Sequence, residues 1–375
     1  MHHPLLKILA FLLFSYTAVG AATPYIPNHK CKECHEKIYE EYEHSAHHLS
    51  YFTDELHRKV ANASNPKTYE CAPCHMPAAS NIDALVSGKE RPRERDVRER
   101  DGVSCFFCHT IAYVKKAHHF NLNLPAKQAE GYKPSLFGSY NNPDESDKHS
   151  SLKSPIYRDN VCMGCHSHKV NENNVTIFRA MHPTDNSRGC IRCHMPMVPG
   201  GAEKHNNRNR SEHHSHRFPG IRDAKFRATG YRLSVSKEPG GIAVTLENRM
   251  PHPMIIQPAR AKYLKITVKR KGKTIWQNYR KSPTEDPKAY FAYYFFKDGH
   301  PIVIPTPATS EKVNNLQGKE IRTLNYKIPG LRSGDQVTVT LYGRLAKEEC
   351  LRAIDLADKR FTTPMKIKEL RWTVP

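Results

Sequence analysis

Five copies of one pattern, Cys-x-x-Cys-His, constrain this chain of 375 residues more than any other feature. In chain order, the first to fifth motifs are Cys31, Cys34 and His35; Cys71, Cys74 and His75; Cys105, Cys108 and His109; Cys162, Cys165 and His166; and Cys190, Cys193 and His194. They use ten of the 11 cysteines, and because all five lie within residues 23–222, each has only about 40 residues of chain. Because so little chain cannot build an ordinary apolar core around every motif, the core must have another source.

The spacing within each motif is the attachment signature of haem c. Two thiols three residues apart both reach the vinyl groups of one porphyrin, and the histidine that follows lies under the iron. Zinc sites and disulfides are the alternatives, but zinc knuckles come in pairs and need no histidine directly after them. We therefore predict five covalently bound haem c groups that pack against one another, with these proximal ligands: His35, His75, His109, His166 and His194.

The sixth position of each iron needs a ligand, and 16 histidines remain outside the motifs and the first 22 residues. Their positions relative to the motifs favour these as distal ligands: His47, His119, His149, His216 and His252, with His118 and His182 as weaker candidates. A solvated surface position is the alternative for each, and we expect it for most of the others: His44, His48, His57, His168, His205, His213 and His214. Met76 and Met195, which directly follow proximal histidines, are expected to pack against a porphyrin edge.

The N-terminus has the pattern of a secretory signal peptide. Met1 to Lys7 include one lysine, Ile8 to Val19 are apolar, and small residues follow up to Ala22. The apolar run is short of the roughly 20 residues that span a bilayer, although an uncleaved anchor is the alternative. We therefore predict a signal peptide over residues 1–22 and a periplasmic or extracellular protein. Cys350, outside the motifs, is expected to be a buried apolar cysteine.

The remaining chain divides into two parts. Residues 23–222 hold all the motifs and predict a mainly α pentahaem cytochrome c domain with few regular elements, with a helix over 33–52 and loop over 120–160. Residues 223–375 predict an all-β, sandwich-like domain of about seven strands. The expected strands are 231–236, 242–246, 263–268, 274–279, 302–304, 321–328, 337–342 and 365–372, with hairpins at Pro239-Gly240-Gly241 and Lys271-Gly272.

The first 220 residues resemble the multihaem c-type cytochromes related to the tetrahaem electron acceptor of hydroxylamine oxidoreductase. The features that carry the resemblance are Cys31-x-x-Cys-His-x-x-x-Tyr39-x-x-Tyr42-x-x-Ser45-x-His47, the Cys-His-Met-Pro segments at 74–77 and 193–196, and His216-Arg-Phe-Pro-Gly. The resemblance implies a haem-stacking α fold, electron transfer, and distal roles for His47 and His216. Residues 248–257 are similar to an Asn-x-x-Gly-His-x-x-Pro element of related cytochromes, with Pro251 and Ile255 as departures.

Electron transfer between redox partners is the function that these features favour. The formal charge of +21, reduced to about +11 by ten haem propionates, suits acidic or membrane-bound redox partners and not nucleic acid. One alternative is a reductase or oxidase of small nitrogen or sulfur compounds at a five-coordinate haem, so enzymatic activity stays open. The absence of Cys-x-x-Cys-Lys argues against an ammonia-forming nitrite reductase. The other alternative, which the surplus of histidines permits, is a homo-oligomer or an extracellular cytochrome filament.

Overall fold

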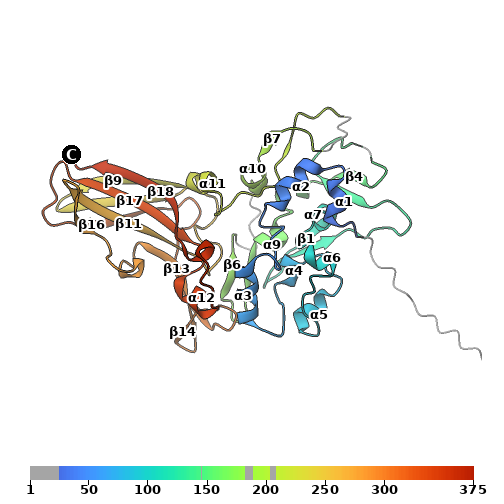
Figure 1. The fold of residues 1–375 in the computed structure, drawn as a ribbon, viewed down its shortest axis with the longest axis horizontal. Helices are drawn as coiled ribbons and strands as arrows, with labels where there is room; N and C mark the ends of the chain where they lie inside the picture. Colours follow the sequence, from blue (N-terminus) through green and yellow to red (C-terminus); the bar gives the residue numbers. More distant parts are fainter. Residues whose placement is uncertain (1–24, 145, 182–188, 203–207) are drawn as a thin grey trace, which may run out of the picture.

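The computed structural model describes residues 25–144, 146–181, 189–202 and 208–375. Two regions lie side by side (Figure 1): an N-terminal region of short helices and strands, residues 25–222, and a sandwich of antiparallel sheets, residues 231–375. This arrangement confirms the predicted fold class. Among the described residues, no helix has the length and apolar character needed to cross a membrane.

The N-terminal region is built from helices of at most ten residues. They are α1 (Asn28–Lys32), α2 (Glu36–Glu43), α3 (Glu55–Ser64), α4 (Ala72–His75), α5 (Ile82–Ser87), α6 (Val97–Arg100), α7 (Cys105–Thr110), α8 (Ile156–Asp159), α9 (Met163–His166) and α10 (Cys190–His194). The helix predicted over 33–52 is therefore shorter than expected, because it ends at Glu43. Helices this short are not stable alone, so their stability must come from what they pack against.

Four small sheets complete the N-terminal region. Their strands are β1 (Ile111–Lys115) with β2 (Leu122–Pro125), β3 (Ser135–Gly138) with β4 (Ser150–Lys153), β5 (His168–Val170) with β6 (Thr176–Arg179), and β7 (Met197–Pro199) with β8 (Glu212–His214). The prediction of loop throughout 120–160 is wrong, because β2, β3 and β4 lie there. The β3–β4 pair is parallel, so a longer connection and not a tight turn joins its two strands, and no hairpin signal marks them.

The sandwich follows α11 (Ala224–Thr229) and consists of a three-stranded and a seven-stranded sheet. The first has the order β16 (Ile321–Lys327), β10 (Gly241–Asn248), β9 (Tyr231–Glu238). The second contains β11 (Ala261–Arg270), β12 (Lys273–Gln277), β13 (Tyr290–Lys297), β14 (His300–Ile302), β15 (Ser310–Asn314), β17 (Gln336–Arg344) and β18 (Met365–Thr373). Alternate residues of the two sheets, such as Val244 and Ile266, meet in one buried apolar cluster.

The sequence predicts most of the sandwich correctly. Both hairpins are confirmed, because Gly241 pairs with Glu238 and Arg270 pairs with Lys273. The strand expected at 302–304 is β14, which ends at Ile302. The sequence analysis missed β13 and β15, and β13 is a strand whose first four residues are all buried.

The sandwich contacts the N-terminal region at an interface that we call the seam. Leu56 and Val60 of α3 pack against Cys350 and Leu351 of α12 (Glu348–Ala353), in a cluster that also includes Phe361 of α13 (Lys359–Thr362). Cys350 is 2% exposed, as the buried-cysteine prediction requires. Two hydrogen bonds outside this cluster also join the two regions: Thr176 Oγ1 donates to Glu311 Oε1 at 2.8 Å, and Arg179 N donates to Ile256 O at 2.9 Å.

Candidate functional site

A cavity of about 1710 Å³ runs through the N-terminal region and reaches the seam. Its lining includes all eight cysteines and all four histidines of the first four motifs. The fifth motif contributes Ile191, and Met195, which directly follows that motif, also lines the cavity. Several remote histidines also line it: His47, His57, His149 and His216. A cavity this large, lined by thiols and imidazoles, is the missing core that the sparse chain predicts.

The local fold of the motifs explains how thiols and imidazole reach the same side. The amide of His35 donates to Cys31 O at 2.9 Å, that of His75 to Cys71 O at 3.0 Å, and that of His166 to Cys162 O at 2.8 Å. Each motif is therefore one helical turn, in which residues three and four apart share a face. Both sulfurs and the imidazole of a motif can consequently bind one porphyrin.

Two pairs of rings have the separation expected for the axial ligands of one iron. Because a metal–imidazole nitrogen bond is about 2 Å long, two such rings have centroids about 6 Å apart. The ring centroids of His35 and His149 are 6.3 Å apart, and those of His109 and His216 are 6.2 Å apart. The first and third motifs therefore each face a histidine that could complete bis-histidine ligation.

The fourth motif has a histidine partner with less regular geometry. The ring centroids of His47 and His166 are 5.8 Å apart, with the rings at 62°. His252, in the loop after β10, is near enough to His194 of the fifth motif for that ring to contribute to the lowering of its pKa, after the larger effect of burial. Among the described residues no ring contact joins His252 to His194, so the fifth motif has a nearby histidine but no ring pair at the ligand distance.

The second motif differs from the others. His75 and His57 are stacked with centroids 3.7 Å apart and planes only 9° apart, which leaves no room for an iron between them. His57 Nε2 lies 3.0 Å from the Tyr69 hydroxyl. Among the described residues, no other ring contact pairs a histidine with His75 at the ligand distance. No pattern in the sequence indicates this stacked pair, and we expected His57 at the surface.

Backbone carbonyls orient several of these rings. The Nδ1 atom of His35 lies 3.0 Å from Ala202 O. The Nδ1 atom of His109 lies 2.7 Å from Phe137 O, and that of His194 lies 2.7 Å from Pro219 O. The candidate distal rings of His216 and His252 are held likewise, by His214 O at 2.8 Å and Pro253 O at 2.9 Å. An Nδ1–H that donates to a carbonyl leaves Nε2 as the unprotonated nitrogen, which is the form that binds iron.

Burial keeps the cavity histidines neutral. It lowers the pKa of His47 and His216 to about 3 and that of His166 to about 4, with neighbouring histidines adding to the effect. Burial is also the main cause that lowers the pKa of His109 and His149. Neutral imidazoles are metal ligands, whereas imidazolium is not.

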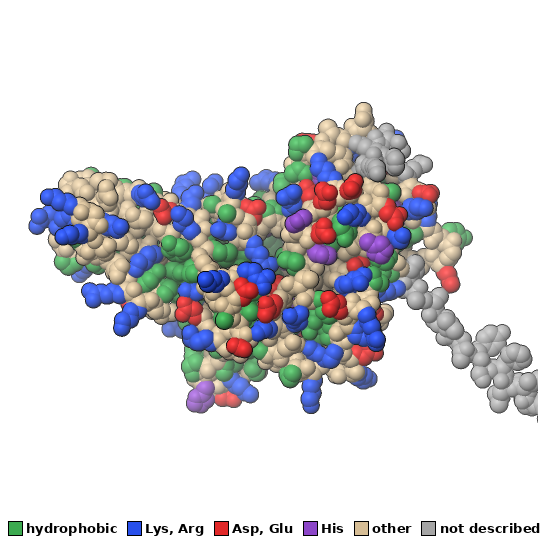
Figure 2. Space-filling model, viewed as in Figure 1, with side chains coloured by type: hydrophobic (Ala, Val, Ile, Leu, Met, Phe, Trp, Pro, Cys, Tyr) green, Lys and Arg blue, Asp and Glu red, His purple; other side chains and the backbone are tan. Residues whose placement is uncertain are grey.

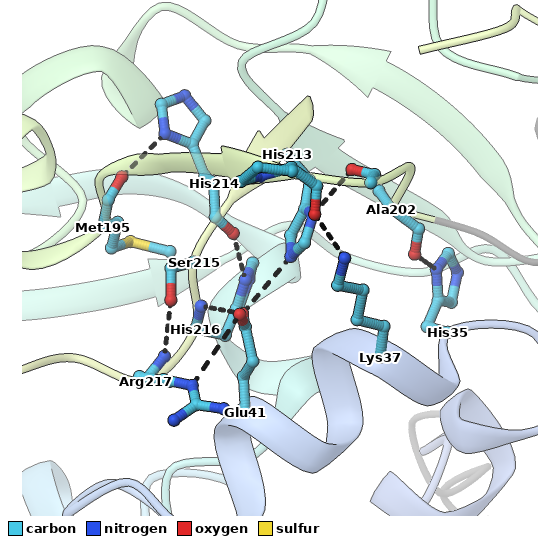
Figure 3. Close-up of polar contacts among 12 residues, drawn as sticks. His35, Lys37, Glu41, Met195, Ala202, His213, His214, Ser215, His216 and Arg217 are labelled. Carbon is cyan, nitrogen blue, oxygen red and sulfur yellow. Dashed lines mark hydrogen bonds and ion pairs between the residues drawn. The ribbon is translucent and has the colours of Figure 1, made fainter. Parts of the chain in front are cut away.

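A buried carboxylate supports the third pair. Glu41 of α2 is 6% exposed, and its Oε2 accepts from the backbone amide of His216 at 2.8 Å. The same oxygen lies 3.3 Å from Nε2 of His213, whose Nδ1 lies 2.8 Å from Gly200 O (Figure 3). Glu41 therefore ties the segment that carries His216 to the helix that follows the first motif. The sequence analysis missed this role, because Glu41 lies in an acidic run that suggests a solvated face.

The remaining histidine candidates lie elsewhere. His118 and His119 are exposed, and His118 Nε2 contacts Asn174 Oδ1 at 2.7 Å, so neither is paired with a motif histidine in the part of the chain that is described. His182 and His205 lie outside the described residues. The surface expectation is wrong for His168 and His213, which are buried with both ring nitrogens in contact with protein oxygen. Met76 is fully buried beside Tyr51 and Ala72, and Met195 lines the cavity.

Comparisons with known proteins agree with this geometry. Residues 30–110 match the family model of cytochrome c554 and c-prime, which confirms the predicted resemblance for this segment. The fold is similar to the crystal structure of a penta-heme cytochrome c552 from Thermochromatium tepidum, with a TM-score of 0.74 and 22% identity over 93% of this chain and 99% of that chain. No curated protein matches the sequence. These matches show that residues 30–110 are similar to a multihaem c-type cytochrome family and that the fold of nearly the whole chain is similar to that of a penta-heme cytochrome.

Proposed function

We propose that this protein is a five-haem electron carrier, in which closely packed haems pass electrons from one redox partner to another. The observation that carries the proposal is the separation of 6.3 Å and 6.2 Å between two pairs of remote histidine rings inside one cavity. Iron held by two imidazoles has no open position for a substrate, so it changes oxidation state without binding one. One shared cavity brings neighbouring haems into contact.

Three of the proposed ligand sets follow from the ring pairs above: His149, His216 and His47 are the distal ligands of the first, third and fourth motifs, respectively. For the fifth motif we propose His252, because it is the predicted distal histidine that lies near His194. Bis-histidine ligation omits the methionine that raises the potential of other c-type cytochromes, so we propose low reduction potentials.

We also propose an exported protein that docks acidic redox partners. Haem c attachment and the apolar N-terminal run both fit export to the periplasm or the cell exterior. Residues 223–375 hold 29 lysines and arginines against 14 aspartates and glutamates, and these basic side chains spread over the sandwich in Figure 2. Such an excess attracts acidic proteins or anionic membrane surfaces and speeds their association.

Mass spectrometry and stopped-flow spectroscopy test the carrier function. The mature protein is expected to carry the mass of five haems, and a strong reductant should reduce all of them before an acidic acceptor protein reoxidises them. A mass of fewer than five haems would contradict the assignment of every motif. Haems that accept electrons but never pass them to another protein would contradict the carrier role.

The second motif favours a second candidate function at one haem. Since His57 is stacked on His75 and not across an iron from it, a haem at this motif would keep an open sixth position. Tyr69, whose hydroxyl lies 3.0 Å from His57 Nε2, lines the cavity together with this motif and is a polar group near it. An open iron with a nearby proton donor suits reduction or oxidation of a small nitrogen compound.

Ligand-binding spectra separate the two candidates. If the second haem is open, carbon monoxide should change the Soret band of the reduced protein by about one haem in five, and His57→Ala should leave that change intact. If His57 moves to bind the iron, carbon monoxide should have no effect on the wild-type protein, and His57→Ala should create a high-spin haem.

A further inference from the structure

Arg260 is a buried charge in the described part of the chain that the contacts above do not explain. It lies in the loop before β11, so it belongs to the sandwich, yet its side chain lines the cavity of the N-terminal region. Its Nε atom is buried without a hydrogen-bond partner, and among the described residues its guanidinium has no ion pair within 4 Å. Burial lowers its pKa to about 10, which still leaves it charged at neutral pH. An unpaired buried charge is costly, so an anion must meet it.

The neighbours of Arg260 do not supply that anion. Arg222 is a second positive charge close by, and it contributes to the lowered pKa of Arg260. The nearest carboxylate, Asp54, is already used twice: Oδ1 accepts from His57 N at 3.2 Å to cap α3, and Oδ2 lies 3.8 Å from Arg222. Two guanidinium groups therefore share one carboxylate, and one more negative charge would balance them. All three side chains line the cavity.

We propose that Arg260, together with Arg222, binds a haem propionate at the seam end of the cavity. This inference rests on the proposed haem content, because haem propionates are the carboxylates that loading of the cavity would bring in. A guanidinium matches a carboxylate with two parallel N–H donors, and the pairing is strong where water is excluded. The contact makes the sandwich part of the cofactor site and raises the potential of that haem, because positive charge favours the reduced iron.

Spectroelectrochemical titration of Arg260→Gln tests the proposal. The variant should keep five haems but show one haem component at lower potential than in the wild-type protein. Arg260→Lys, which keeps the charge, should have a potential close to the wild-type value. Arg371→Gln is the matched control in the sandwich, because Arg371 is 81% exposed and pairs with Glu369, and it should leave every potential unchanged. Unchanged potentials in a five-haem Arg260→Gln protein would overturn the proposal and leave the carrier function standing.

A structure of the haem-loaded wild-type protein gives a second test if Arg260→Gln does not accumulate. The expected result is a propionate oxygen within hydrogen-bond distance of the Arg260 guanidinium. A guanidinium that contacts only protein groups or water would overturn the proposal, whereas a preparation without five haems would contradict the proposed function itself.

Discussion

The N-terminal region and the sandwich obtain their stability in different ways. In the sandwich, 24 buried residues, joined by Val175 of the N-terminal region, form one cluster between two sheets, so its own side chains supply nearly all of the core. In the N-terminal region, a cluster of seven buried residues around Tyr69 and Leu85 lies beside a cavity of about 1710 Å³. Porphyrins are large apolar bodies, so haem attachment can supply the burial that this region lacks. The comparison shows that one chain can combine a core made of residues with a core made of cofactor.

Removing the haems should have the largest effect and should destabilise only the N-terminal region. If the chain is produced without cytochrome c maturation, residues 25–222 should lose protection from hydrogen exchange, because short helices around an empty cavity are not stable. Residues 231–375 should remain protected. Hydrogen exchange with mass spectrometry measures both regions at once, and equal protection of the two regions would show that the N-terminal region does not depend on haem.

A cavity made in the sandwich core should have the next largest effect. Ile266 of β11 is fully buried between the sheets, so Ile266→Ala should lower the free energy of unfolding by about 3 kcal/mol. The Soret spectrum should not change, because Ile266 is not among the residues that line the cavity. Denaturant unfolding followed by circular dichroism checks the value. Ile321→Ala is the control, because Ile321 is 64% exposed and its truncation should cost no more than about 0.5 kcal/mol.

A cavity made at the seam should lower the free energy of unfolding by a smaller amount. Leu56 of α3 is 9% exposed and packs against the cluster around Cys350. Leu56→Ala should cost about 2 kcal/mol and increase the hydrogen exchange of both α3 and α12, because each covers the other. An increase confined to α3 would show that the two regions are stabilised independently.

The smallest predicted effect is on the support of His216. Glu41→Gln keeps the shape of the side chain but removes the charge that accepts from the His216 amide, at a cost of about 1 kcal/mol. The low-spin electron paramagnetic resonance signal of one haem should shift while the others stay. Glu40→Gln, at the neighbouring exposed position, is the control. A Glu41→Gln spectrum identical to those of Glu40→Gln and the wild-type protein would show that Glu41 does not orient this ligand.

The parts predictable from sequence are those encoded by short-range patterns. The attachment motifs are read directly from the spacing of cysteine and histidine, and the hairpin at Pro239-Gly240-Gly241 follows from its turn residues. The run Tyr290–Lys297 was missed as a strand because aromatic residues fill both of its faces and no alternation marks it. The strands within 120–160 were missed because β2, β3 and β4 have only four residues each, too few for an alternation to show, and the β3–β4 pair is parallel and lacks a hairpin turn.

Ligand pairing depends on contacts that sequence separation conceals. His149 follows His35 by 114 residues, and only the tertiary fold brings their rings to 6.3 Å. His119 and His149 have equally suggestive positions near motifs, yet His119 is exposed and His149 faces a motif histidine. Glu41 and Arg260 carry no local signal either, because their partners are a remote backbone amide and a cavity. These features require the fold.

Electron paramagnetic resonance of the oxidised protein, with the spins counted against the haem content, measures how many irons have two histidine ligands. We expect at least four low-spin ferric haems, one for each pairing of a motif histidine with His149, His216, His47 or His252. A fifth, high-spin signal would correspond to the second motif. High-spin ferric iron at most of the haems would contradict bis-histidine ligation, and with it the electron-carrier function.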